Sequence, residues 1–125
     1  SALLAELVQW SEEHNQSIIQ RAMRYIDQHY KEKCSLQDVA SYVFLNPKYF
    51  GHLFKRETGE SFVNYVTRLR LENAATLLSN TDQMVTSIAK ACGYDDPNYF
   101  ATVFRKRYHL TPNEYRKQTG SSNKQ

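Results

Sequence analysis

The feature that most constrains the fold is an internal repeat with an offset of 50 positions. Residues of the first half that return in the second half are proline and aromatic residues: Pro47, Tyr49, Phe50, Phe54 and Tyr65 recur as Pro97, Tyr99, Phe100, Phe104 and Tyr115. A basic pair follows each aromatic group, Lys55–Arg56 and then Arg105–Lys106, and upstream Val39–Ala40 matches Ile88–Ala89 at an offset of 49. Each unit reads as a short helix, a tight turn and a second helix, which is the pattern of a helix-turn-helix.

Helical spacing fills the rest of the chain, and strand alternation is almost absent. Asn46–Pro47 and Asp96–Pro97 each combine a capping residue with a proline that suits the first helical position, and Gly59 suits a helix end. We predict an all-α fold of two helix-turn-helix subdomains joined by a long central linker helix, with about seven helices plus an N-terminal leader helix. The expected ranges are 1–15 for the leader, about 16–60 and 81–117 for the subdomains, about 61–80 for the linker and 118–125 for a disordered tail.

The charge is divided along the chain. The net charge of the 125 residues is only +3, but residues 1–15 hold three glutamates and no basic residue, so the remainder carries +6. The leader also places Leu3, Leu7 and Trp10 on one helical face. We interpret it as an interdomain or dimer-facing segment, while a helix that covers the core of its own domain is an equally open alternative.

A repeated helical hairpin used as a scaffold would explain the aromatic residues as core. It explains the number of units less well, because solenoids generally need three or more repeats. It also leaves the basic pairs unexplained. A linker rod of about 28 Å is of the same scale as the roughly 34 Å between successive major grooves on one face of DNA. The repeat therefore favours one chain that reads two grooves.

The sequence resembles the AraC/XylS family of bacterial transcription regulators. The resemblance covers about residues 18–117 and is most specific in the second unit: Ile88–Ala89, Gly93–Tyr94, Tyr99–Phe100, Phe104–Arg105–Lys106, Thr111–Pro112 and Tyr115–Arg116. The first unit matches through Glu57–Thr58–Gly59 and the residues of the repeat, and the linker through Arg70, Ala74 and Leu77–Leu78. The family implies a seven-helix DNA-binding domain whose third and sixth helices, here 47–58 and 97–108, enter DNA grooves.

The resemblance also implies which side chains face DNA. The expected base-contacting positions are Lys48, Gly51, His52, Asn98, Ala101 and Thr102. Lysine and histidine can donate to guanine, asparagine can pair with adenine, and the threonine methyl can meet a thymine methyl. The expected phosphate-contacting residues, which add affinity without sequence information, are Asn46, Lys55, Arg56, Arg105 and Lys106.

Four positions depart from the family pattern, one of them Ser87, where an acidic residue is common. Phe44 stands where the first turn often has glycine, and His109 replaces the glycine that would match Gly59. Because side chains disfavour the left-handed conformation, we expect the first turn and the end of the sixth helix to differ in shape. Met84 is a poor N-cap for the fifth helix.

Other classes of function have little support. The four histidines show no metal-ligand spacing and no phosphate-cradling glycine loop exists, so we expect no enzyme, cofactor or metal. Cys34 and Cys92 are interpreted as reduced packing residues, and no apolar run suits a membrane helix. The expected location is the cytoplasm. The expected partners are double-stranded DNA, RNA polymerase, and a second copy through residues 1–15 or a preceding domain, the parent being a two-component response regulator. A helical protein-interaction module that docks on RNA polymerase, and a DNA-repair enzyme with an appended domain, remain as alternatives.

Overall fold

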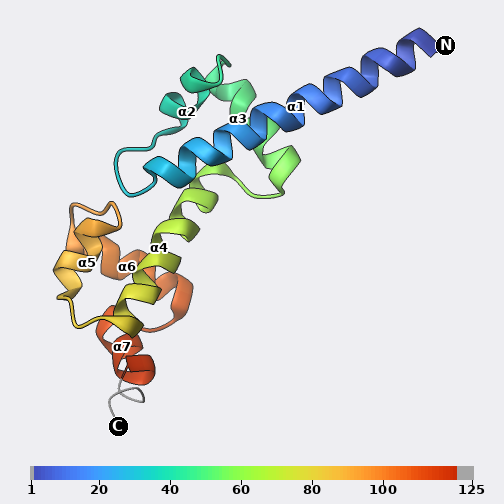
Figure 1. The fold of residues 1–125 in the computed structure, drawn as a ribbon. Helices are drawn as coiled ribbons and strands as arrows, with labels where there is room; N and C mark the ends of the chain where they lie inside the picture. The colour runs from blue at the N-terminus through green and yellow to red at the C-terminus, as the bar shows by residue number, and fades with distance from the viewer. Residues whose placement is uncertain (1, 121–125) are drawn as a thin grey trace. The chain divides into compact units, whose positions relative to one another are not determined.

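The structure is a computed structural model that describes residues 2–120, and these residues form seven α-helices with no strand (Figure 1). The helices are α1 (Ala2–His29), α2 (Leu36–Tyr42), α3 (Pro47–Thr58), α4 (Phe62–Asn80), α5 (Val85–Ala91), α6 (Pro97–Tyr108) and α7 (Pro112–Gly120). The all-α prediction is confirmed, and α3 and α6 have the bounds expected for the two recognition helices.

The chain folds into two compact units. Of the described residues, the first unit contains 2–29 and 34–66, and the second contains 30–33 and 67–120. The division falls inside α4, so the linker helix contributes its first turn to the first unit and the rest to the second. The short segment 30–33, which follows α1, belongs to the second unit.

In the first unit, α1, α2 and α3 pack against one another around an apolar core. Its fully buried side chains include Ile26, Val39, Phe50 and Phe54. The first buried residue of α1 is Ile18, and residues 2–14 are all exposed. The sequence predicted a separate leader helix, but the leader is instead the first half of α1. Neither glycine nor proline occurs between residues 2 and 29, so nothing in the sequence breaks the helix there.

In the second unit, α5, α6 and α7 pack with the larger part of α4. The buried cluster draws its residues from α4, α5, α6 and the turn between α5 and α6: Leu71, Ala74, Ala75, Leu78, Ile88, Ala89, Cys92, Tyr94, Phe100 and Phe104. Tyr115 of α7 packs against this cluster. Both cysteines of the chain are buried and unbridged.

The sequence repeat is also a repeat in three dimensions. The ring centroids of Phe50 and Phe54 lie 5.7 Å apart, and those of Phe100 and Phe104 also lie 5.7 Å apart. Phe54 meets Tyr65 edge-on at 5.3 Å, and Phe104 meets Tyr115 edge-on at 5.4 Å. In each unit, the second phenylalanine therefore packs its helix against the tyrosine of the helix that follows.

The two positions where glycine was expected keep the left-handed backbone. Phe44 has φ 61° and His109 has φ 63°, so the expectation of a different shape at these positions is wrong. The His109 N–H donates to the carbonyl of Arg105 at 2.7 Å, as the Gly59 N–H donates to that of Lys55 at 2.8 Å. Both side chains are exposed, so packing against the rest of the unit does not oppose this backbone.

The end of the chain also differs from the expectation. Helix α7 continues to Gly120, so residues 118–120, which were assigned to the tail, are helical. The Thr119 hydroxyl donates to the carbonyl of Tyr115 at 2.9 Å and accepts from the hydroxyl of Ser79 at 2.9 Å. These bonds fix the last turn of α7 against the end of α4. The remainder of the predicted tail, 121–125, lies outside the described residues.

Candidate nucleic-acid interface

The expected base-contacting residues of the first unit share one face of α3. Lys48, His52 and Lys55 are exposed there, at spacings of four and three residues. Gly51 lies between them and is half-buried, and a Cβ at this position would be 3.9 Å from the methyl groups of Leu36. Gly51 therefore brings the backbone near the surface at the centre of this face, and the nitrogen-bearing side chains of Lys48, His52 and Lys55 surround it.

Helix α6 presents the same face in the second unit. Asn98, Thr102 and Arg105 are exposed, and Ala101 is half-buried between them. The Thr102 hydroxyl donates to the carbonyl of Asn98 at 3.0 Å. At the offset of 50, Asn98 replaces Lys48 and Thr102 replaces His52, so the two faces share a shape and differ in hydrogen-bonding groups.

Side-chain caps fix the first turn of each helix. The Asn46 Oδ1 atom accepts from the N–H groups of Lys48 at 2.9 Å and Tyr49 at 3.3 Å. The Asp96 Oδ1 atom accepts from the N–H of Asn98 at 2.9 Å. A proline follows each cap at the first helical position. The backbone that carries Lys48 and Asn98 is thus held before any ligand arrives.

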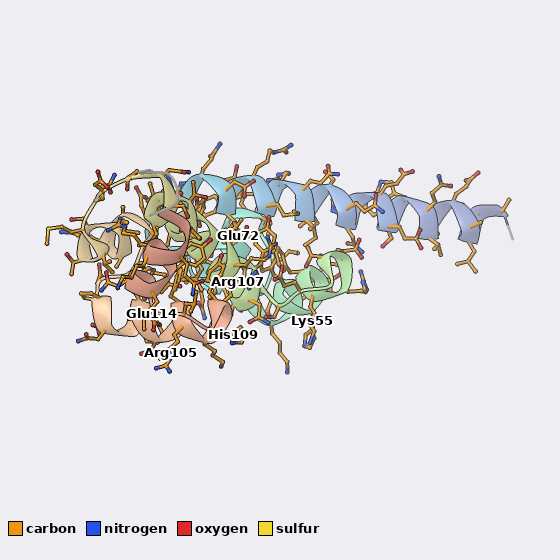
Figure 2. All side chains as sticks on the ribbon, turned by 90° about the horizontal axis from the view of Figure 1, so that it is seen from below. Lys55, Glu72, Arg105, Arg107, His109 and Glu114 are labelled. Atoms are coloured by element: carbon orange, nitrogen blue, oxygen red, sulfur yellow. The ribbon has the colours of Figure 1, made fainter. Side chains whose placement is uncertain are left out.

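The basic residues divide between two surfaces. Lys55 and Arg105 extend the recognition faces of α3 and α6 by one turn, and Figure 2 labels both. Arg56 is exposed but points elsewhere: its Nε atom lies 3.4 Å from a carboxylate oxygen of Glu57, and it lines a groove of about 500 Å³ with residues of α1. Lys106 is exposed as well.

Two exposed tyrosines that were not expected at the site lie next to it along the chain. Tyr49 is 50% exposed and Tyr99 is 59% exposed, although the repeat suggested an apolar, core-facing role. Each tyrosine directly follows a base-contacting candidate. Because neighbouring residues of a helix point about 100° apart, a tyrosine next to a buried phenylalanine could have been expected outside the core. Arg107 is also exposed, and its guanidinium carbon lies 6.0 Å from the ring centroid of Tyr108.

The pKa shifts in this unit report packing rather than acid–base chemistry. Burial raises the pKa of the Tyr94 phenol, of the Tyr108 phenol and of the Cys92 thiol. Hydrogen bonds from Thr111 lower the pKa of Glu114. None of these groups is a paired acid and base in a cleft.

The described residues also bear on metal binding and membrane crossing. Within residues 2–120, no group of three or more histidine, cysteine, aspartate or glutamate side chains is placed to hold a metal ion. None of the described helices combines the length and the apolar character that crossing a membrane requires.

The fold and these two faces define a DNA-binding domain with two helix-turn-helix units. The helix-turn-helix domain family matches residues 39–118, more than half of the chain. The chain is 43% identical over 102 residues to the regulatory protein PocR of Salmonella typhimurium, covering 82% of this chain and 34% of PocR. The chain belongs to the AraC/XylS family of transcription regulators.

Solved structures agree with this assignment. The C-terminal domain of AraT, a response regulator from Geobacillus stearothermophilus, is 37% identical with a TM-score of 0.79, covering 81% of this chain and 84% of that domain. The DNA-binding domain of the transcriptional factor AdpA, solved in complex with a target DNA, has a TM-score of 0.80 over 86% of this chain and 96% of its own. At 21% identity, that match establishes the fold.

Proposed function

We propose that this chain binds double-stranded DNA in a sequence-specific manner, with α3 and α6 in successive major grooves. The observation that carries the proposal is the repeated exposed face, Lys48–His52–Lys55 and Asn98–Thr102–Arg105, on two helices of equal length with capped first turns. A face built twice with different hydrogen-bonding groups suits two different half-sites better than it suits a scaffold.

Each residue has a role in this proposal. Lys48 and His52 donate to guanine, Asn98 pairs with adenine, and the Thr102 methyl contacts thymine. Gly51 and Ala101 let the backbone approach the bases closely. Of the residues proposed to contact phosphates, Asn46, Lys55, Arg105 and Lys106 flank these faces, and Arg56 lies on the groove lined by α1.

The test begins with selection of bound sites from random DNA, followed by gel-shift titrations against the selected site and scrambled duplexes. Asn98→Ala is expected to lose roughly 1–3 kcal/mol on the selected site and little on scrambled DNA. Arg105→Ala is expected to weaken binding to every duplex and to reduce the salt slope by about one. The matched pair separates base reading from phosphate binding on one helix.

Two outcomes would contradict the proposal. Equal affinity for selected and scrambled duplexes in competitor DNA would refute sequence-specific binding and favour a protein-interaction module. A footprint that covers a single major groove would refute the engagement of both helices.

The whole protein is a further part of the proposal. The chain spans about a third of the length of PocR. We propose that the whole protein is cytoplasmic and that this domain acts in it with another, such as the receiver of a response regulator. RNA polymerase is the proposed partner in transcription.

The exposed first half of α1 favours a second copy of the chain as another proposed partner, bound through this segment. Five large apolar side chains are at least half exposed there: Leu3, Leu4, Leu7, Val8 and Trp10. Leu3, Leu7 and Trp10 follow the spacing of four and three residues that a coiled-coil seam uses. Glu6 and Glu13 take positions that flank the seam, so the seam residues Leu3, Leu7 and Trp10 carry no charge.

Sedimentation velocity of the wild-type chain and of a Leu7→Glu variant tests this partner. We expect a concentration-dependent dimer that Leu7→Glu abolishes and that Ala5→Glu, a change on the far side of the helix, preserves. A wild-type chain that stays monomeric at every concentration would refute dimerisation through this segment.

A further inference from the structure

Arg70 makes an unusual set of contacts for a residue of a linker helix. It lies in α4 and is half-buried in the second unit. Its Nε atom donates to the carbonyl of Tyr30 at 2.7 Å, and its Nη2 atom donates to the carbonyl of Glu32 at 2.9 Å. One guanidinium therefore holds two carbonyls of segment 30–33, which has no helix of its own to satisfy them.

The same guanidinium lies against the turn that precedes α6. A Cβ at Gly93 would lie 3.0 Å from the Arg70 Nε atom and 3.1 Å from the Tyr30 carbonyl oxygen, closer than side chains normally approach. Gly93 has φ 99°, so glycine is required there for both its backbone and its space. The Arg70 guanidinium carbon is 5.5 Å from the ring centroid of Tyr94, within cation–π distance.

Tyr94 passes this constraint to the recognition helix. Its ring centroid lies 5.4 Å from that of Phe100 and 6.1 Å from that of Tyr99. Both partners are in the first turns of α6, immediately after Asn98. Tyr94 therefore lies between Arg70 and the two residues that directly follow Asn98 in α6.

The first unit has the same turn without this clamp. Gly93 and Tyr94 correspond to Phe44 and Leu45, and both turns make the same backbone bonds at 3.1 and 2.9 Å. Phe44, however, is 85% exposed. The comparison separates the backbone turn, which the two units share, from the arginine contact, which the second unit adds.

We propose that Arg70 is a positioning residue for the second recognition helix, clamping segment 30–33 and the Gly93–Tyr94 turn so that Asn98 is presented in one orientation. The role in base reading rests on the proposed DNA-binding function. Arg70 itself touches no base: it acts through Tyr94.

The test is Arg70→Lys, with Arg116→Lys as the matched control. Lysine keeps the charge but cannot donate from two points of a planar fork or lie flat on a ring. Arg116 also donates through Nε and Nη2 to two carbonyls in the same unit, those of Leu78 and Thr81, both at 3.2 Å. The control therefore removes a similar fork at the other end of α4.

The first measurement is amide hydrogen exchange in the free protein. The Phe100 N–H, bonded to the Asp96 carbonyl at 3.0 Å, reports the first turn of α6, and the Phe104 N–H reports the middle of the same helix. Arg70→Lys is expected to raise the exchange of Phe100 relative to Phe104 by about tenfold. Arg116→Lys is expected to change both rates by the same factor. Equal behaviour of the two variants would overturn the proposal.

The second measurement is base discrimination on the selected DNA site. Arg70→Lys is expected to lose about tenfold of the discrimination at bases in the α6 half, the scale of one base contact, and to keep discrimination in the α3 half. Tyr94→Leu, which leaves the arginine its two carbonyls, is expected to give the same pattern. An equal loss in both halves would overturn the positioning role. A wild-type chain that discriminates in neither half would refute the proposed function instead, and the exchange experiment would still decide the role of Arg70 in the free protein.

Discussion

Replacing Phe44 by glycine should stabilise the protein, although a large apolar side chain is removed. Phe44 has φ 61°, a left-handed backbone that costs a non-glycine residue roughly 1–2 kcal/mol. Glycine avoids this cost but loses more backbone freedom on folding, by roughly 0.5–1 kcal/mol. Because the Phe44 side chain is 85% exposed, little burial is lost. The expected net change is a gain of about 0.5–1 kcal/mol in the free energy of unfolding.

The assay is urea denaturation followed by circular dichroism at neutral pH. Gly59→Ala provides the reverse experiment, because Gly59 has φ 80° and a Cβ there would have no atom within 4 Å. Its cost therefore reports the backbone conformation alone, and we expect a loss of about 1 kcal/mol. His109→Gly, at φ 63° in the second unit, should gain as Phe44→Gly does.

The reasoning would be refuted if Phe44→Gly lowered the free energy of unfolding while Gly59→Ala also lowered it. That combination would mean that the exposed phenyl ring makes an interaction worth more than the strain of its backbone. An unchanged m-value is needed for the comparison, because a changed slope would indicate a different unfolded state.

Two further predictions concern helix caps in the second unit. Met84 is the N-cap of α5, makes no side-chain cap hydrogen bond and is 69% exposed. Met84→Asp should therefore raise the free energy of unfolding in urea denaturation by about 0.5–1 kcal/mol, while Met84→Ala should not. Equal stability of the two variants would contradict this prediction. The Glu114 carboxylate accepts from the Thr111 N–H at 2.8 Å, which holds its pKa below the ordinary 4.5. Its stabilising contribution is therefore complete above the unfolded-state pKa and is lost as the pH falls through the folded-state pKa. Glu114→Gln should lower stability at pH 7 and flatten its decline in that acidic range, and a decline identical to that of the wild type would count against the bond.

Local signals in the sequence were strong at the recognition helices. Asn46–Pro47 and Asp96–Pro97 each supply a cap and a fixed φ at the start, and the observed helices begin at those prolines. The repeated phenylalanines predicted which face is buried, because spacing along a helix fixes direction around it. The same reasoning misjudged Tyr49 and Tyr99, which sit at the edge of the apolar face, where spacing alone does not tell contact from exposure.

Nonlocal contacts explain most of what the sequence did not predict. Residues 118–120 look like a polar tail, and they are helical because Thr119 meets Ser79, 40 positions away. Phe44 and His109 are a local exception: both were expected to alter their turns, yet both keep a left-handed backbone, with the Phe44 N–H donating to the Ser41 carbonyl and the His109 N–H to the Arg105 carbonyl. The roles of the base-contacting and phosphate-contacting residues remain predictions.

The sequence by itself determined the class of fold, the two-unit repeat, the recognition helices and the family, because caps, prolines and apolar spacing act within a few residues. Only the tertiary structure decided that segment 30–33 belongs to the second unit and that Arg70 joins it to the Gly93–Tyr94 turn. The bonds from Arg70 to the carbonyls of Tyr30 and Glu32 span 40 and 38 positions of the chain. Their physical cause is that carbonyls outside the helices need donors, and no local pattern records which distant donor meets that need.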